Sequence, residues 1–188
     1  RIASNQRGSL ISLVNDQGET MKAWHFVGDT LRDGLAIPED GKWLVYSGPL
    51  VLCESGLHAS REPFDALQYA PGNTLCYVEI AGEMIQQKDK IVCRKRKIIR
   101  RMNAEEMLHY FARMQALSCI HLWDAPDMVL DYLMSGDESM RAAARAAAGA
   151  AARAAERAAA WDAAWAAARA AARKEFNELV YESFGIKS

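Results

Sequence analysis

The sequence offers His25, His58 and Tyr69 as its candidates for catalytic chemistry. A histidine titrates near neutral pH, so it can act as a general acid or base in a suitable site. Ser55 or Ser60 with one of these histidines would form a hydrolase-type triad, but the G-x-S-x-G motif of such enzymes is absent. The residues therefore predict no complete catalytic site.

The four cysteines are Cys53, Cys76, Cys93 and Cys119, and none forms a C-x-x-C pair. Their wide spacing predicts neither a metal site nor a cofactor. Cys53 precedes His58 by five residues, a spacing that matches no recognised nucleophile pair. The first ten residues lack the apolar core of a signal peptide, so we expect reduced thiols and a cytoplasmic location.

One dense positive cluster stands out in a chain whose net charge is −1. Its members are Arg94, Lys95, Arg96, Lys97, Arg100 and Arg101. Such a cluster can bind nucleic acid through phosphates. The alternative is an exposed edge strand, where basic side chains discourage pairing with other chains. Because acidic residues balance basic ones overall, the chain is not a generally basic nucleic-acid binder.

The elements that must position these residues predict an α+β fold. Strand-like segments come first and helical ones follow, which favours a small mixed or antiparallel sheet with short helices and then a helical region. Alternation over residues 74–80 predicts a strand, and the apolar runs at 43–46 and 50–53 predict a hairpin. We expect a flexible or non-native extension at 1–20, a body at 21–134 and an alanine-rich tail at 135–188.

The tail predicts a long helix, because alanine occupies 22 of the 31 positions from 142 to 172. A capping box at Ser135-x-x-Glu138 would begin it, and a turn at Gly149 would fold it into a hairpin. Frequent charges exclude a membrane span. Trp161 and Trp165 are costly to leave in water, so we expect them to dock onto the body or a second copy.

Four sequence segments occur in a distinctive order: Gly56-Leu57-His58-Ala59-Ser60, Tyr69-Ala70-Pro71-Gly72, Val78-Glu79-Ile80-x-Gly82-Glu83 and Asp89-Lys90-Ile91-Val92. In this order they resemble a family of small uncharacterised proteins of tailed phages and bacteria, some with a similar Ala/Arg/Trp-rich tail. The resemblance implies a phage or prophage origin and a location in the cytoplasm of a bacterial host. It brings no known activity, so we predict an accessory or interaction protein whose tail mediates self-association or docking to another protein.

A second resemblance covers only an outline. Ala23-Trp24-His25, Gly34-Leu35, Gly56-x-x-x-Ser60 and Ala66-x-x-Tyr69 are similar to segments of ADP-ribosyltransferases. This resemblance implies that His25 contacts the ribose of NAD. The catalytic glutamate of that family has no match, since Glu79 and Glu83 lie on a different strand from the one expected. The alternative function is therefore an NAD-binding transferase or its inactive relative, and otherwise we expect no enzyme.

Overall fold

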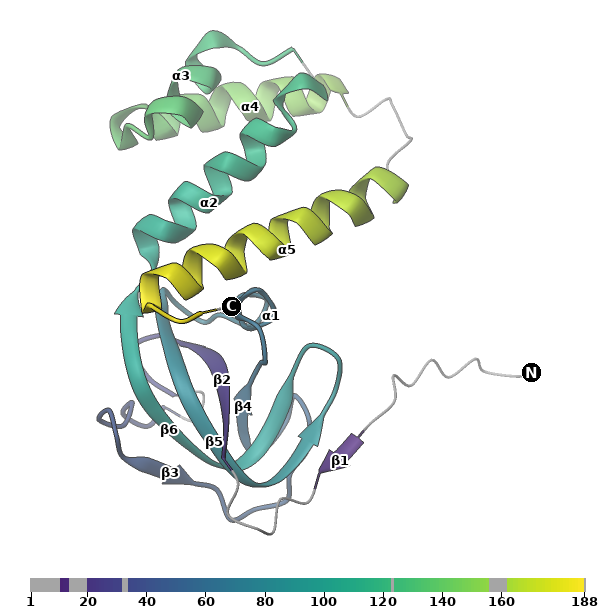
Figure 1. The fold of residues 1–188 in the computed structure, drawn as a ribbon. Coiled ribbons are helices and arrows are strands. Elements are labelled where there is room, and N and C mark those ends of the chain that lie inside the picture. Colours follow the sequence, from purple (N-terminus) through teal and green to yellow (C-terminus); the bar gives the residue numbers. More distant parts are fainter. Residues whose placement is uncertain (1–10, 14–19, 32–33, 123, 156–161, 188) are drawn as a thin grey trace, which may run out of the picture. The chain divides into compact units, whose positions relative to one another are not determined.

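The chain forms two compact units, Arg1–Ala104 and Glu105–Ser188, each considered separately (Figure 1). The computed structural model describes residues 11–13, 20–31, 34–122, 124–155 and 162–187. The division falls earlier than the boundary at 134/135 that the sequence suggested. Residues 105–134, which the sequence assigned to the body, belong to the second unit, because the helices they form contact the C-terminal helices.

The first unit is built on one antiparallel sheet, to which the described residues contribute six strands. These are β1 (Ile11–Leu13), β2 (Thr20–Val27), β3 (Trp43–Val45), β4 (Leu57–Ala59), β5 (Thr74–Gln86) and β6 (Ile91–Asn103). The α+β prediction is confirmed, and the strand expected at 74–80 is the first half of β5. Residues 11–13 pair with β5, so this part of the N-terminal extension belongs to the sheet.

The long β5–β6 pair carries all the other strands. β1 and β2 pair with β5, while β3 and β4 pair with β6. The hairpin predicted from residues 43–46 and 50–53 is therefore wrong, because β3 pairs with residues 95–97 of β6 instead. Residues 51–55 form a tight loop of their own, closed by hydrogen bonds between Val51 and Ser55.

A register shift bends the β5–β6 pair and sets which side chains share a face. The pairing shifts between Ala81 and Met84, where Gly82 has a φ of +79°, a conformation that glycine adopts without strain. Figure 1 shows both strands curving along their length. On one face lies a continuous core cluster formed by Ala23, Val27, Ala59, Cys76, Val78, Ile80, Met84, Ile91, Cys93 and Ile98.

The other face of β2 is aromatic and anchors a short helix. Trp24 is buried, and its ring centroid lies 4.8 Å from that of Tyr77 on β5. The backbones of Trp24 and Ser60 exchange two hydrogen bonds, of 2.7 and 2.8 Å. These bonds fix the start of the segment leading to α1 (Pro63–Leu67), whose Pro63 and Ala66 are buried and which contacts β2.

The second unit consists of helices. They are α2 (Glu105–Ser118), η1 (Ile120–Leu122), α3 (Asp127–Ser135), η2 (Glu138–Met140), α4 (Arg141–Ala155) and α5 (Asp162–Phe184). α2 contacts α3 and α5, and α3 contacts α4. Phe111 of α2 packs on Phe176 of α5, with ring centroids 4.9 Å apart. Phe176, Val180 and Phe184, which recur every four residues along α5, are buried.

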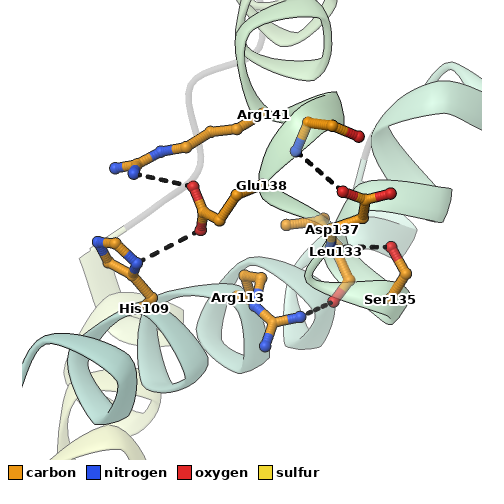
Figure 2. Close-up of polar contacts among 8 residues, drawn as sticks. His109, Arg113, Leu133, Ser135, Asp137, Glu138 and Arg141 are labelled. Carbon is orange, nitrogen blue, oxygen red and sulfur yellow. Dashed lines mark hydrogen bonds and ion pairs between the residues drawn. The ribbon is translucent and has the colours of Figure 1, made fainter.

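Polar contacts join α2 to the α3–α4 connection (Figure 2). Glu138 accepts from Arg141 at 3.1 Å and lies 3.4 Å from His109 Nδ1. Gly136, with a φ of +70°, ends α3. The expected Ser135–Glu138 capping box is replaced by a neighbouring cap, because Asp137 accepts from the Ser139 amide at 2.9 Å.

The tail is described as two helices rather than one. α4 runs through Gly149, so the turn expected there is wrong. Alanine has the highest helix propensity, and eleven alanines among the 15 residues of α4 outweigh the cost of one glycine. Trp161 lies outside the described residues, as does the side chain of Trp165. None of the described helices is both long and apolar enough to cross a membrane.

Gly72 provides a test of the packing between α1 and β2. A Cβ atom at Gly72 would lie 2.7 Å from the Gly28 Cα, and backbone cannot move aside as a side chain can. We expect Gly72→Ala to lower the free energy of unfolding by about 1–3 kcal/mol. A Cβ at Gly28 would meet nothing closer than 3.4 Å, so Gly28→Ala is the matched control. Urea unfolding of both variants checks the difference, and equal losses would contradict it.

Candidate functional site

The basic cluster lies on β6 and is not an edge strand, because residues 94–97 are hydrogen-bonded to neighbours on both sides. Three of its cations are paired with carboxylates: Arg94 with Glu83 at 2.7 Å, Lys97 with Glu79 at 2.9 Å, and Arg101 Nε with Asp40 at 2.7 Å. Arg96 is buried, whereas Lys95 and Arg100 are exposed. Half of the cluster is thus paired with carboxylates, and its members are split between the two faces of the sheet.

His25, a catalytic candidate from the sequence, and Arg96, a member of the basic cluster, both lie on the core face of the sheet. His25 is paired in register with Cys76, and Arg96 with Ile80, and both partners belong to the core cluster. Burial lowers the pKa of His25 well below its usual value, and the positive charge of Arg96 adds to this effect. The ring is therefore neutral at physiological pH. We call His25 and Arg96 the interior pair.

A second group surrounds an exposed cysteine. Cys53 lies in the 51–55 loop with a φ of +66°, a left-handed conformation shown by no other described residue except glycine. The ammonium of Lys90, from the turn between β5 and β6, donates to Cys53 Sγ at 2.8 Å. This hydrogen bond is the largest of the effects that raise the pKa of Lys90.

Tyr69 and Asp89 complete the support of Lys90. The Lys90 Nζ lies 5.1 Å from the centroid of the Tyr69 ring, within range of a cation–π contact. The Tyr69 hydroxyl donates to Asp89 at 2.5 Å. Desolvation and this bond to the carboxylate raise the pKa of Tyr69, so the phenol stays protonated. Asp89 thus orients the ring, and the ring orients the ammonium.

His58 connects the loop to the interior pair. Leu57 lies against the core cluster and Ala59 belongs to it, so alternation along β4 directs the imidazole of His58 to the other side. Its Nε2 accepts from the Cys53 amide at 3.0 Å, which requires the remaining ring proton to lie on Nδ1. The carbonyl of His58 accepts from Arg96 NH1. One residue therefore holds both the cysteine loop and the buried guanidinium.

We call Cys53, His58, Tyr69, Asp89 and Lys90 the thiol cluster. The sequence suggested His58 and Tyr69, and the structure joins them through Cys53 and Lys90. Cys53 was set aside because its spacing from His58 matches no nucleophile pair, and in fact the imidazole contacts its amide rather than its sulfur. Asp89 and Lys90 were noted only as part of a motif. Three of the four motif segments contribute residues to the thiol cluster. Their joint occurrence was the feature of the sequence that could have indicated Asp89 and Lys90 as site residues.

The glutamates weighed for the transferase alternative do not face His25. Glu79 alternates with Val78 and Ile80, so it lies on the opposite face of β5 from the core cluster. It is held there by Lys22 and Lys97 at 3.3 and 2.9 Å. Glu83 is bound by Arg94. Among the residues that the structure describes, no group of three His, Cys, Asp or Glu side chains could hold a metal ion.

Glu79 gives a testable pH dependence. Hydrogen bonds from Thr20 and Lys97 lower its pKa from 4.5 to about 2. A carboxyl with a lowered pKa stabilises the fold above its unfolded pKa, and this contribution disappears as the pH falls through the folded one. We expect the free energy of unfolding to decrease between pH 4.5 and about 2, and to decrease less in Glu79→Gln. Urea unfolding over this pH range measures the free energy, with Glu83→Gln as the control. If the free energies of the wild type and Glu79→Gln fell in parallel with pH, the expectation would be contradicted.

Comparison with known proteins gives a match for the region that contains the thiol cluster and the interior pair. No curated protein and no solved structure matches the chain. A family model described as a domain of unknown function matches residues 21–110. This region contains the whole thiol cluster and the interior pair, and it ends within α2. Over residues 21–110, the chain is therefore similar to the uncharacterised DUF7666 family.

Proposed function

We propose that the first unit acts through the thiolate of Cys53, which attacks an electrophilic centre of a ligand. The observation that carries this proposal is the 2.8 Å hydrogen bond from the Lys90 ammonium to the sulfur of an exposed cysteine. The thiolate is the nucleophilic form of cysteine, and a neighbouring cation favours it. The chemical class of the ligand is a small molecule or modified side chain with an electrophilic carbon.

Each member of the thiol cluster has a role in this proposal. Lys90 stabilises the thiolate before attack, and Tyr69 and Asp89 position Lys90. His58 holds the Cys53 amide and so fixes the direction of the side chain. During attack the sulfur lone pair forms the S–C bond, and the electron pair displaced from carbon stays on the ligand. The Lys90 ammonium can then deliver a proton to that charge.

The other cysteines of the first unit do not compete for this role. Cys76 and Cys93 are both buried in the core cluster. Burial raises the pKa of Cys76 to about 11 and that of Cys93 to about 12, so both remain neutral thiols. Cys119, in the second unit, is exposed, and its sulfur lies 3.6 Å from Ser118 Oγ. It offers an exposed thiol for comparison within the same molecule.

Alkylation kinetics test the proposal. In the wild type, we expect iodoacetamide at neutral pH to modify Cys53 faster than Cys119, as followed by mass spectrometry of peptides. Lys90→Met removes the stabilising charge, so it should slow the modification of Cys53 about threefold to tenfold. Lys88→Met, which removes an exposed lysine of the same turn, is the matched control.

The outcomes of this experiment are distinct. An unchanged rate at Cys53 in Lys90→Met would show that the ammonium does not activate the sulfur. Equal rates at Cys53 and Cys119 in the wild type would also contradict the proposal. Tyr69→Phe keeps the ring under Lys90 but loses the bond to Asp89, so we expect an intermediate rate.

We propose a second role for the helical unit, as the interaction part of a phage-type accessory protein in the host cytoplasm. Its support is the exposed methionines of α3, where Met134 is 72% and Met128 46% exposed. Methionine side chains adapt to varied partners and are frequent on interaction surfaces. A cytoplasmic location accords with the four free cysteines. A second copy of the chain is the partner that we propose.

Light scattering of the full chain tests this second role. We expect the wild type to form a dimer and the Met128→Glu/Met134→Glu variant to have half that mass, because a charge at either position opposes its burial. Leu35→Glu, which changes an exposed apolar residue of the first unit, is the control. A monomeric wild type, or a double variant that still forms the dimer, would overturn self-association through these methionines.

A further inference from the structure

Arg96 is a buried cation on the core face of the sheet. Its side chain belongs to the inward set of β6, and only 6% of the residue is exposed. Arginine is among the residues least often buried unless a partner balances its charge. Burial lowers the pKa of Arg96, but a guanidinium remains protonated under all physiological conditions. The charge must therefore be balanced or solvated where it is.

No anionic group of the described residues balances this charge. Arg96 donates from NH1 to the carbonyl of His58, and no carboxylate among the described residues forms an ion pair with it. The neighbouring thiols, Cys76 and Cys93, are neutral because burial raises the pKa of each. Asp40 also lies near Cys76, but it is paired with Arg101.

The remaining donors of the interior pair keep access to solvent. Among the described residues, every buried nitrogen or oxygen of a side chain has a hydrogen-bond partner. The nitrogens of Arg96 that make no hydrogen bond must therefore retain some accessible surface. The same holds for the ring of His25, which forms no hydrogen bond with any described residue. Arg96 and His25 thus both keep nitrogens accessible on the core face, and the charge of Arg96 acts on the imidazole.

We propose that Arg96 and His25 form a binding site for an oxyanion, the carboxylate or phosphate group of a small molecule. A planar guanidinium with free N–H groups matches two oxygens of such a group, and the apolar surroundings strengthen the attraction. The neutral imidazole of His25 supplies one further donor. The interior site is independent of the reactivity of Cys53, although His58 contacts both.

Binding of inorganic phosphate and of acetate provides the test. Each is titrated into the full-length protein at constant ionic strength, and the ring resonances of His25 and the unfolding temperature are followed. We expect a saturable shift of the His25 resonances and a rise in unfolding temperature. Arg96→Met should weaken binding about tenfold or more, because a charge-assisted donor is lost. Lys95→Met, which removes an exposed cation from the neighbouring position of the same strand, is the matched control.

The two anions distinguish the sources of the oxyanion. Tighter binding of phosphate indicates a phosphorylated ligand, and tighter binding of acetate indicates a carboxylate; either result supports the site. If neither anion shifts the His25 resonances of the wild type, the proposal is overturned, whether or not Arg96→Met folds. Equal binding by Arg96→Met and the wild type would also overturn it. Cys53→Ser should bind like the wild type, which separates this test from that of the thiol cluster.

Discussion

The hydrogen-bonded ladder between β5 and β6 is the constraint on which the first unit depends. Every other strand described pairs with one of these two, so their mutual register decides where all the others lie. The register shift at Gly82 matters most, because the alternation of side chains changes there. On β6 it places Cys93 and Arg96 on the same face although three positions separate them. Without the shift, the guanidinium would leave the core face.

The ladder also brings the thiol cluster together. Its turn carries Asp89 and Lys90, and its edge at residues 91–93 holds β4. The loop before β4 supplies Cys53, and the segment after α1 supplies Tyr69. The cluster is thus built from loops, but each loop begins or ends at an element fixed by the ladder or by the backbone bonds of Ser60 with Trp24. A rigid sheet that positions reactive loops is a common arrangement of functional sites.

Local features of the fold were predictable from the sequence, and pairings distant in sequence were not. Alternation located the first half of β5, because it depends only on neighbouring residues. Turn residues between two apolar runs suggested that β3 pairs locally, but its partner lies about 50 residues away. Cys53 and Lys90 are 37 residues apart, and their contact depends on strand register that no spacing rule contains. His58 and Tyr69 were found only because their residue types invite chemistry.

Cys53 occupies a position where stability and chemistry favour different residues. Its left-handed backbone is the conformation that glycine adopts at no cost, and a side chain with a Cβ atom is strained there by about 1 kcal/mol or more. Glycine at 53 would keep the loop and the amide bond to His58, and it would relieve that strain. A chain selected for stability alone would therefore carry glycine at this position. The sulfur atom at this position comes with backbone strain, which the use proposed for the thiol would explain.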